Sequence, residues 1–109
     1  MTTATFFMEG NRIAGFDISG HSGYADEGGD IVCAAVTSAV RLVEATVNDV
    51  FGLSAAVKIH KKSGSVSLRL PVGLSDRDEH AAQGLLSGLM LHFSSLHDEY
   101  PDNIEVLEA

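Results

Sequence analysis

The chain has a single cysteine, Cys33, among its 109 residues. An internal disulfide is therefore impossible, and a lone thiol is typical of proteins from reducing compartments. The chain also lacks the CxxC pair of dithiol redox enzymes, a zinc-type spacing of cysteine and histidine, and the Gly-Lys-Ser/Thr sequence of a phosphate loop. We therefore expect no metal and no cofactor, and the thiol becomes a candidate nucleophile.

Basic residues are also scarce, with seven lysines and arginines against fifteen acidic residues and a formal net charge of −8. Nonspecific nucleic-acid binding needs a basic face, so we expect no direct contact with nucleic acid. The negative charge favours a cationic partner through long-range steering, although acidity also simply keeps a protein soluble.

Neither a membrane span nor a secretion signal is expected. No uninterrupted apolar run reaches the roughly 20 residues that cross a bilayer. The first ten residues lack a basic region followed by a long apolar stretch. These features predict a cytoplasmic protein with no membrane contact. The length and the 45% hydrophobic content are typical of a single globular domain, which we place over residues 1–109.

Alternating apolar residues predict two β-hairpins. The first turns at Gly10-Asn11, a pair that suits a two-residue connection, and the second turns around Ser63-Gly64. In each hairpin one face is apolar and the other polar, so we expect a sheet that is covered on one side and solvated on the other. A last short strand is expected at residues 103–107.

Two helices are predicted between and after the hairpins. Asp30 is a good N-cap for the first, which we expect to end at Gly52, and the second begins after Ser75 and stops before Pro101. Their expected buried stripes are Val32, Val36, Ala39, Val43, Val47 and Val50, then Ala82, Leu85, Leu86, Leu89, Phe93 and Leu96. The order predicts an α+β domain in which two helices pack on one face of a mainly antiparallel sheet.

Cys33 is predicted at about the third position of the first helix. The amides and macrodipole of a helix N-terminus favour a negative charge there, so the position suits a thiolate nucleophile. The simpler interpretation is that Cys33 is a small buried apolar residue, as its VCAAV context also allows.

His21 and Asp30 are the candidate partners of this thiol. His21 ends the second predicted strand, and a glycine-rich loop connects it to the helix, so its imidazole could reach the sulfur as a general base. The alternative is an exposed loop histidine. Asp30 could cap the helix or orient His21 as a third catalytic member; it cannot easily do both with full strength, and the cap is the better fit.

The segment GHSGYADEGGDIVCAAVTSAV resembles the ribosomal-processing cysteine proteases of bacteria. That family has a His-Ala-Gly-Tyr-Ala stretch followed by Gly-x-Asp-Ile-Val-Cys-Ala-Ala at the same interval. Ser22 replaces the usual alanine and Thr37 stands where serine is common. The matching positions are His21, Gly23, Tyr24, Ala25, Gly28, Asp30, Ile31, Val32, Cys33, Ala34 and Ala35.

The resemblance implies a homodimeric protease with a catalytic Cys33–His21 pair and no cofactor. It also implies that the substrate is the N-terminal extension of a basic large-subunit ribosomal protein, number twenty-seven. The loop would order around the peptide, with Gly23, Tyr24, Gly28 and Gly29 as its substrate-contacting residues, and amides of the loop or the helix N-terminus would stabilise the oxyanion. Two alternatives are a non-catalytic ribosome-associated binding protein of the same fold and a thiol redox sensor.

Overall fold

The sheet has five strands in the spatial order β3-β4-β2-β1-β5. The computed structural model describes residues 1–21, 23–26 and 30–109. The strands are β1 (Thr2–Glu9), β2 (Arg12–Ser19), β3 (Ala56–His60), β4 (Ser65–Arg69) and β5 (Ile104–Glu108). Three neighbouring pairs are antiparallel, and β5 runs parallel to β1. The predicted hairpins and the mainly antiparallel sheet are confirmed.

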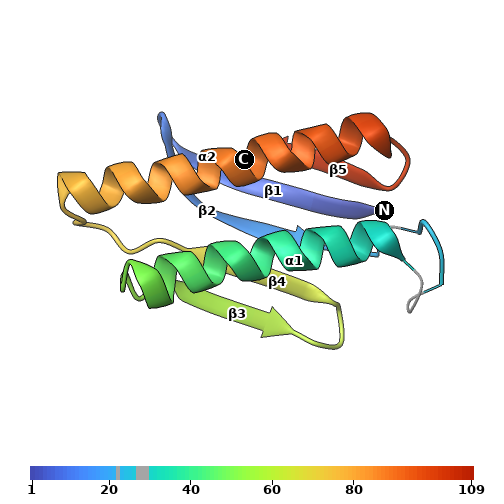
Figure 1. Ribbon diagram of the computed structural model, residues 1–109, viewed down its shortest axis with the longest axis horizontal. Helices are drawn as coiled ribbons and strands as arrows, with labels where there is room; N and C mark the ends of the chain where they lie inside the picture. The colour runs from blue at the N-terminus through green and yellow to red at the C-terminus, as the bar shows by residue number, and fades with distance from the viewer. Residues whose placement is uncertain (22, 27–29) are drawn as a thin grey trace.

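Two helical segments cover one face of this sheet (Figure 1). Helix α1 (Ile31–Ala45) continues into a π-helical turn, η2 (Thr46–Val50), and α2 (Asp76–Glu99) runs in the opposite direction. Asp30 and Ser75 cap α1 and α2 through their side chains, as the sequence indicated. The predicted α+β class, with both helices on one face, is therefore confirmed.

The core lies between the helices and the inner face of the sheet. Its centre is a cluster of three fully buried phenylalanines, with Phe6 6.0 Å from Phe16 and 6.3 Å from Phe93 between ring centroids. Five of the six residues expected in the α2 stripe are buried, and Leu85 is partly buried against the same cluster. Burial of these side chains is the main force that holds α2 on the sheet.

Polar contacts fix the far end of the first hairpin to α2. The β1–β2 register shifts after Phe7, and the Gln83 amide pairs with the backbone of Ile13, accepting from its N–H at 2.7 Å and donating to its carbonyl at 2.8 Å. Arg12 contacts Glu79 at 2.7 Å, and that hydrogen bond raises the pKa of the guanidinium. A strand irregularity is thus satisfied by a helix side chain.

The predicted stripe of the first helix is wrong at its last residue. Val50 is 74% exposed, whereas Val47 is fully buried and Phe51 packs against the core. The cause is η2, in which Phe51 N–H donates to Thr46 five residues back. A π-turn advances less per residue than an α-turn, so Val50 rotates away from the sheet and Phe51 takes its place.

The expectation that the whole apolar face of the sheet is covered is wrong at one edge. Ile59 is on the apolar face of β3, but it is 64% exposed. Strand β3 is at the edge of the sheet, and its end beside the β3–β4 turn extends beyond the cover of α1. This leaves an apolar strip of sheet open beside the helix.

One helix departs from the expectation that no segment is long and apolar enough to span a membrane. The helical segment Ile31–Val50 is long and apolar enough to cross a membrane by length and composition alone. A core helix also meets those criteria, and this one packs Val32, Val36, Val40 and Val43 against the sheet. We therefore treat it as the core helix on which the candidate nucleophile lies.

Candidate active site

Cys33 is the third residue of α1 and is partly exposed at the helix N-terminus. Asp30 fixes this first turn, because its Oδ1 accepts a hydrogen bond from the Cys33 N–H at 2.9 Å and its carbonyl accepts from Ala34 N–H at 3.1 Å. The sulfur therefore lies where the helix dipole stabilises a negative charge. The alternative of a fully buried structural cysteine does not fit its partial exposure.

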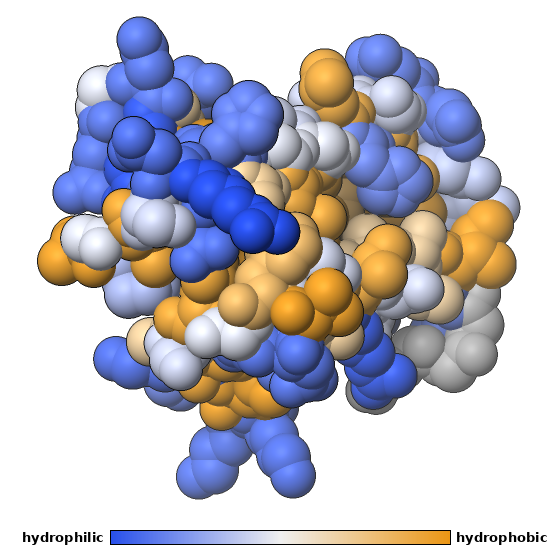
Figure 2. Space-filling model, turned by 60° about the vertical axis from the view of Figure 1, so that its left-hand side comes forward, coloured by the Kyte–Doolittle hydropathy of each residue, from blue (hydrophilic) through white to orange (hydrophobic). Residues whose placement is uncertain are grey.

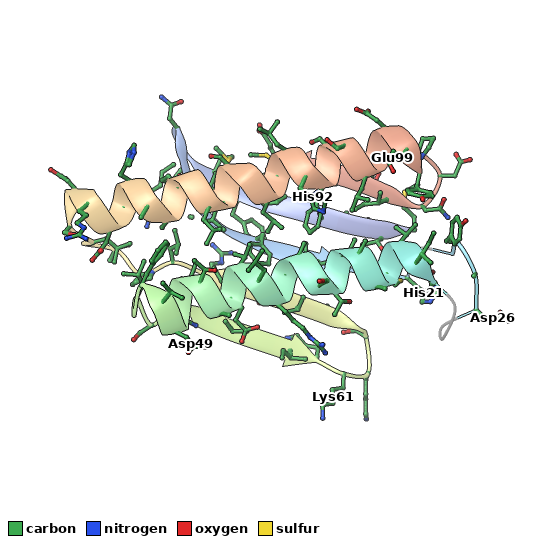
Figure 3. The ribbon with its side chains drawn as sticks, viewed as in Figure 1. His21, Asp26, Asp49, Lys61, His92 and Glu99 are labelled. Atoms are coloured by element: carbon green, nitrogen blue, oxygen red, sulfur yellow. The ribbon has the colours of Figure 1, made fainter. Side chains whose placement is uncertain are left out.

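His21 lies two residues beyond the end of β2 and near the N-terminal end of α1 (Figure 3). Its Nδ1 is 3.6 Å from Asp30 Oδ2. A histidine nitrogen, the Cys33 sulfur and a carboxylate oxygen of Asp30 all lie within 4.8 Å of one another. The structure thus brings together the three side chains that the sequence singled out.

Gly20 explains why the chain can place His21 there. Its φ of +83° is in the left-handed region, and a Cβ at this position would lie 2.4 Å from the carbonyl oxygen of Met1. Any other residue would be strained and would collide with the backbone. The turn that directs His21 toward α1 therefore depends on glycine at position 20.

Asp30 is placed to perform both of the roles that the sequence interpretation treated as competing. Its side chain is fully buried, with Oδ1 on the Cys33 amide and Oδ2 facing His21. A carboxylate has two oxygens with about four lone-pair sites, so one oxygen can cap the helix while the other faces the imidazole. The capping role is therefore confirmed, and the orienting role of Asp30 toward His21 stays a prediction.

The predicted substrate loop is described only in part. The Gly23 N–H donates to His21 Nδ1 at 3.1 Å, and the ring of Tyr24 meets the ring of Tyr100 edge-on with centroids 5.4 Å apart. Gly28 and Gly29 lie outside the described residues.

An open groove of about 980 Å³ runs from Cys33 along α1. Its walls are α1 on one side and the β3–β4 turn on the other, and its lining includes the apolar side chains of Ile18, Ile59 and Val66. Figure 3 shows Lys61 projecting from the β3–β4 turn, on the opposite side of the groove from α1. An extended peptide in this groove would pass the sulfur and rest its side chains on the uncovered strip of sheet.

Thr2 is a groove residue that sequence reasoning missed. It is 2% exposed, and its Oγ1 has no hydrogen-bond partner in the described part of the chain. A buried hydroxyl without a partner is rare and normally has a functional or structural cause. The alternating pattern of β1 predicts that Thr2 faces inward, but nothing in the sequence indicates that its hydroxyl lacks a partner there.

The geometry narrows the choice of oxyanion donors. The Cys33 amide is already bonded to Asp30 Oδ1, and the Ala34 amide is bonded to the Asp30 carbonyl. These two amides are already paired, so the other amides of the loop or the helix N-terminus are the better candidates for oxyanion donors.

The same Cys, His and Asp atoms are metal-type donors, and they are the one such cluster in the described residues. Sequence spacing gave no sign of it, because the fold joins residues 21, 30 and 33 through a loop and a helix turn. A metal ion at this point would occupy the sulfur and imidazole that a nucleophilic reaction needs.

His92 and His97 are not members of this cluster. His97 contacts the Ile104 carbonyl through Nδ1 at 2.6 Å and joins α2 to β5. His92 projects from α2 toward α1 (Figure 3), and its ring lies 6.1 Å from that of Phe93. These contacts give both histidines a place in the packing of α2 rather than in the cluster around Cys33.

Comparison with known proteins identifies the family that this chain matches. Residues 1–105 match the family model described as cysteine protease Prp. The chain is 29% identical over 94 residues to the ribosomal processing cysteine protease Prp of Bacillus subtilis (strain 168), which covers 86% of this chain and 84% of that protein.

Solved structures share the fold. A crystal structure of an essential ribosomal processing protease Prp from S. aureus, in complex with a covalently linked product peptide, matches with a TM-score of 0.83 and 22% identity over the whole of both chains. SMU.848 from Streptococcus mutans matches with a TM-score of 0.84 and 20% identity, over 99% of this chain and 93% of that one. Because the family match extends over residues 1–105 of 109, this chain belongs to the Prp family of cysteine proteases.

Proposed function

We propose that this protease removes the N-terminal extension of large-subunit ribosomal protein number twenty-seven during ribosome maturation. The observation that carries the proposal is a thiol at a helix N-terminus, clustered with an imidazole and a buried carboxylate, at the end of an open groove. The ribosomal substrate is supported by the loop motif and by the ribosomal-processing role in the name of the B. subtilis relative.

The reaction we propose is acyl transfer by Cys33 and His21. His21 accepts the thiol proton, and the sulfur attacks the scissile carbonyl carbon. The carbon–nitrogen bond then breaks, and His21 returns the proton to the leaving amine. Water, deprotonated by His21, hydrolyses the thioester and restores the thiol. Asp30 Oδ2 would hold the imidazole and stabilise its protonated form.

The groove favours an extended substrate with an apolar residue near the scissile bond. Ile59 and Val66 are contributed by β3 and β4, and Ile59 is 64% exposed without substrate. Covering such a side chain with an apolar substrate residue stabilises the complex by about 2 kcal/mol.

The charge of the whole chain supports a basic substrate. With a net charge of −8, the protein attracts a cationic ribosomal protein over distances of about 10 Å or more at low salt. Attraction by charge and binding in the apolar groove select the substrate independently. The groove binds the extension, whereas the electrostatic field of the enzyme acts on the whole substrate. We expect no nucleic-acid contact and a cytoplasmic location for the enzyme.

We also propose a homodimer that forms through the outer surface of the helical layer. Between Glu79 and Asp98, α2 has no Asp, Glu, Lys or Arg, and Leu91 and Leu42 are 70% and 65% exposed on α2 and α1. Apolar side chains also reach the surface over the centre of the face in Figure 2. Two copies that each carry −8 repel one another, so the acid-free part of α2 is the surface that best fits a second copy.

The test is cleavage of the host's own extended ribosomal protein, followed by mass spectrometry of the products. We expect the wild type to release the intact extension and Cys33→Ala to release nothing. A substrate with the extension sequence scrambled is the matched control, and it should remain uncut. A protein that binds the extension but never cuts it would support the non-catalytic binding alternative, and cleavage by Cys33→Ala would exclude Cys33 as the nucleophile.

A further inference from the structure

Tyr100 is a well-fixed residue that contacts the loop between His21 and α1. It caps the C-terminus of α2, where its N–H donates to the Leu96 carbonyl at 2.8 Å. Its own carbonyl accepts from Asn103 N–H at 3.0 Å, and its side chain packs against the hydrophobic core. Two backbone hydrogen bonds and core packing hold this ring in place.

Tyr24 rests on this fixed ring. The two rings meet edge-on at 5.4 Å and 89°, and Tyr24 itself is 46% exposed. The residue before it, Gly23, donates its N–H to His21 Nδ1 at 3.1 Å. The contacts therefore form a chain from the end of α2, through two aromatic rings and one amide, to the catalytic imidazole.

The Gly23 contact uses Nδ1 of His21 as a hydrogen-bond acceptor. A backbone N–H is a donor under all conditions, so Nδ1 must accept and must carry no proton. A protonated imidazole has a proton on both nitrogens and cannot accept this hydrogen bond. Asp30 Oδ2, 3.6 Å from the same Nδ1, can accept only when that nitrogen carries a proton. The Gly23 and Asp30 contacts with Nδ1 therefore exclude one another.

We propose that Tyr100 is a positioning residue that acts through Tyr24 and the Gly23 amide to keep Nδ1 of His21 occupied as a hydrogen-bond acceptor, and so unavailable to Asp30, in the resting enzyme. Substrate would displace the Gly23 amide, and the freed Nδ1 would take the Cys33 proton. The resulting imidazolium would donate from Nδ1 to Asp30 Oδ2 and pass its Nε2 proton to the leaving amine. The proposal rests on the Cys33–His21 pair proposed above. Arg41, Lys61 and Lys62 also line the groove that contains His21, and they can only donate; Glu44 is the one other carboxylate in that lining among the described residues.

The first test is the ring nitrogen spectrum of His21, read by long-range ¹H–¹⁵N NMR. We expect an unprotonated Nδ1 in the wild type and in Tyr100→Phe, which keeps the edge-on ring contact. In Tyr100→Ala the Nδ1 signal should move toward the protonated or averaged position. An unchanged Nδ1 signal in folded Tyr100→Ala, or the same change in Tyr100→Phe, would overturn the proposal.

The second test is the rate at which iodoacetamide alkylates Cys33 at pH 7. Loss of the ring contact in Tyr24→Ala should raise this rate about two- to tenfold, because His21 becomes free to take the thiol proton. Tyr24 is a half-exposed loop residue, so this variant keeps the test available if Tyr100→Ala does not fold. An equal or slower rate in Tyr24→Ala would contradict the proposal.

The matched control is Phe7→Ala. It also removes a surface ring contact, that with Arg69 at 4.2 Å, but on the opposite face of the sheet, and its alkylation rate should equal that of the wild type. A faster rate in this control would also overturn the proposal, because it would show that general loosening exposes the thiol. Neither measurement uses a substrate, so an error in the ribosomal substrate would leave both results unchanged.

Discussion

Asp30 contacts both the helix and the imidazole, one through each carboxylate oxygen. Asparagine keeps one oxygen and caps a helix as well as aspartate, but it has no charge to stabilise protonated His21. Asp30→Asn should therefore keep its free energy of unfolding within about 0.5 kcal/mol and lose about 10- to 100-fold in kcat. Peptidase kinetics and urea unfolding measure the two effects.

Asp30→Ala is the companion variant. It removes the cap as well, so it should lose about 1 kcal/mol of stability in addition to the loss of activity. If Asp30→Asn retained full kcat, Asp30 would be only a helix cap.

The second prediction for a single residue concerns the buried hydroxyl of Thr2. Its buried Oγ1 has no partner in the described part of the chain, and such a group costs about 1–3 kcal/mol. Thr2→Val removes the hydroxyl and keeps the shape, so it should raise the free energy of unfolding by about 1 kcal/mol. Urea unfolding of the variant and the wild type measures it.

The neighbouring Thr3 supplies the control for Thr2. Its hydroxyl donates to Glu105 at 2.9 Å, so Thr3→Val should instead lose about 0.5–1.5 kcal/mol. Destabilisation of Thr2→Val would show that its hydroxyl has a partner in solution.

Single residues were predictable from sequence where one local rule decides them. Cys33 follows from its place in a helix N-terminus and Asp30 from its capping preference, and both positions are as expected. The dual contact of Asp30 and the unpartnered Thr2 hydroxyl were not predictable, because both depend on residues that only the fold brings near.

At the element scale, the uncovered end of β3 is the feature with functional consequences. Ile59 is 64% exposed in the groove, so replacing it should cost little stability but should weaken binding of an apolar substrate residue. We expect Ile59→Asn to raise KM about 30-fold, since covering such a side chain is worth about 2 kcal/mol, and Ile59→Leu to change KM little.

Leu107→Asn is the matched control for Ile59→Asn. Leu107 is 46% exposed in β5, the other edge strand, and its replacement should leave KM unchanged. Equal KM values for Ile59→Asn and the wild type would exclude this strip as a substrate-binding surface.

The elements themselves were largely predictable, because apolar periodicity, caps and turn glycines agree along the chain. The failures are at Val50 and Ile59. At Val50 a π-turn changes the angle per residue, and at Ile59 the strand lies at an edge that the helix does not cover. Periodicity predicts which face of an element is apolar, but it does not predict whether a neighbour covers that face.

For the whole molecule, the prediction concerns assembly. Leu91 is 70% exposed in the charge-free part of α2, so a charge there should oppose a second copy. We expect the wild type to sediment as a dimer and Leu91→Glu as a monomer with the same far-UV spectrum. Val72→Glu, at a position 83% exposed outside the helical layer, should remain dimeric. A monomeric wild type would contradict the proposed homodimer.

The central claim is that Cys33 forms a covalent acyl intermediate with the help of His21. Rapid acid quenching during cleavage of the extended ribosomal protein, followed by intact-mass analysis, tests it most directly. The account predicts that wild-type enzyme gains the mass of the released N-terminal fragment, localised to Cys33, and that His21→Ala and Cys33→Ala gain nothing. Release of the fragment without an adduct, together with continued cleavage by Cys33→Ala, would contradict it.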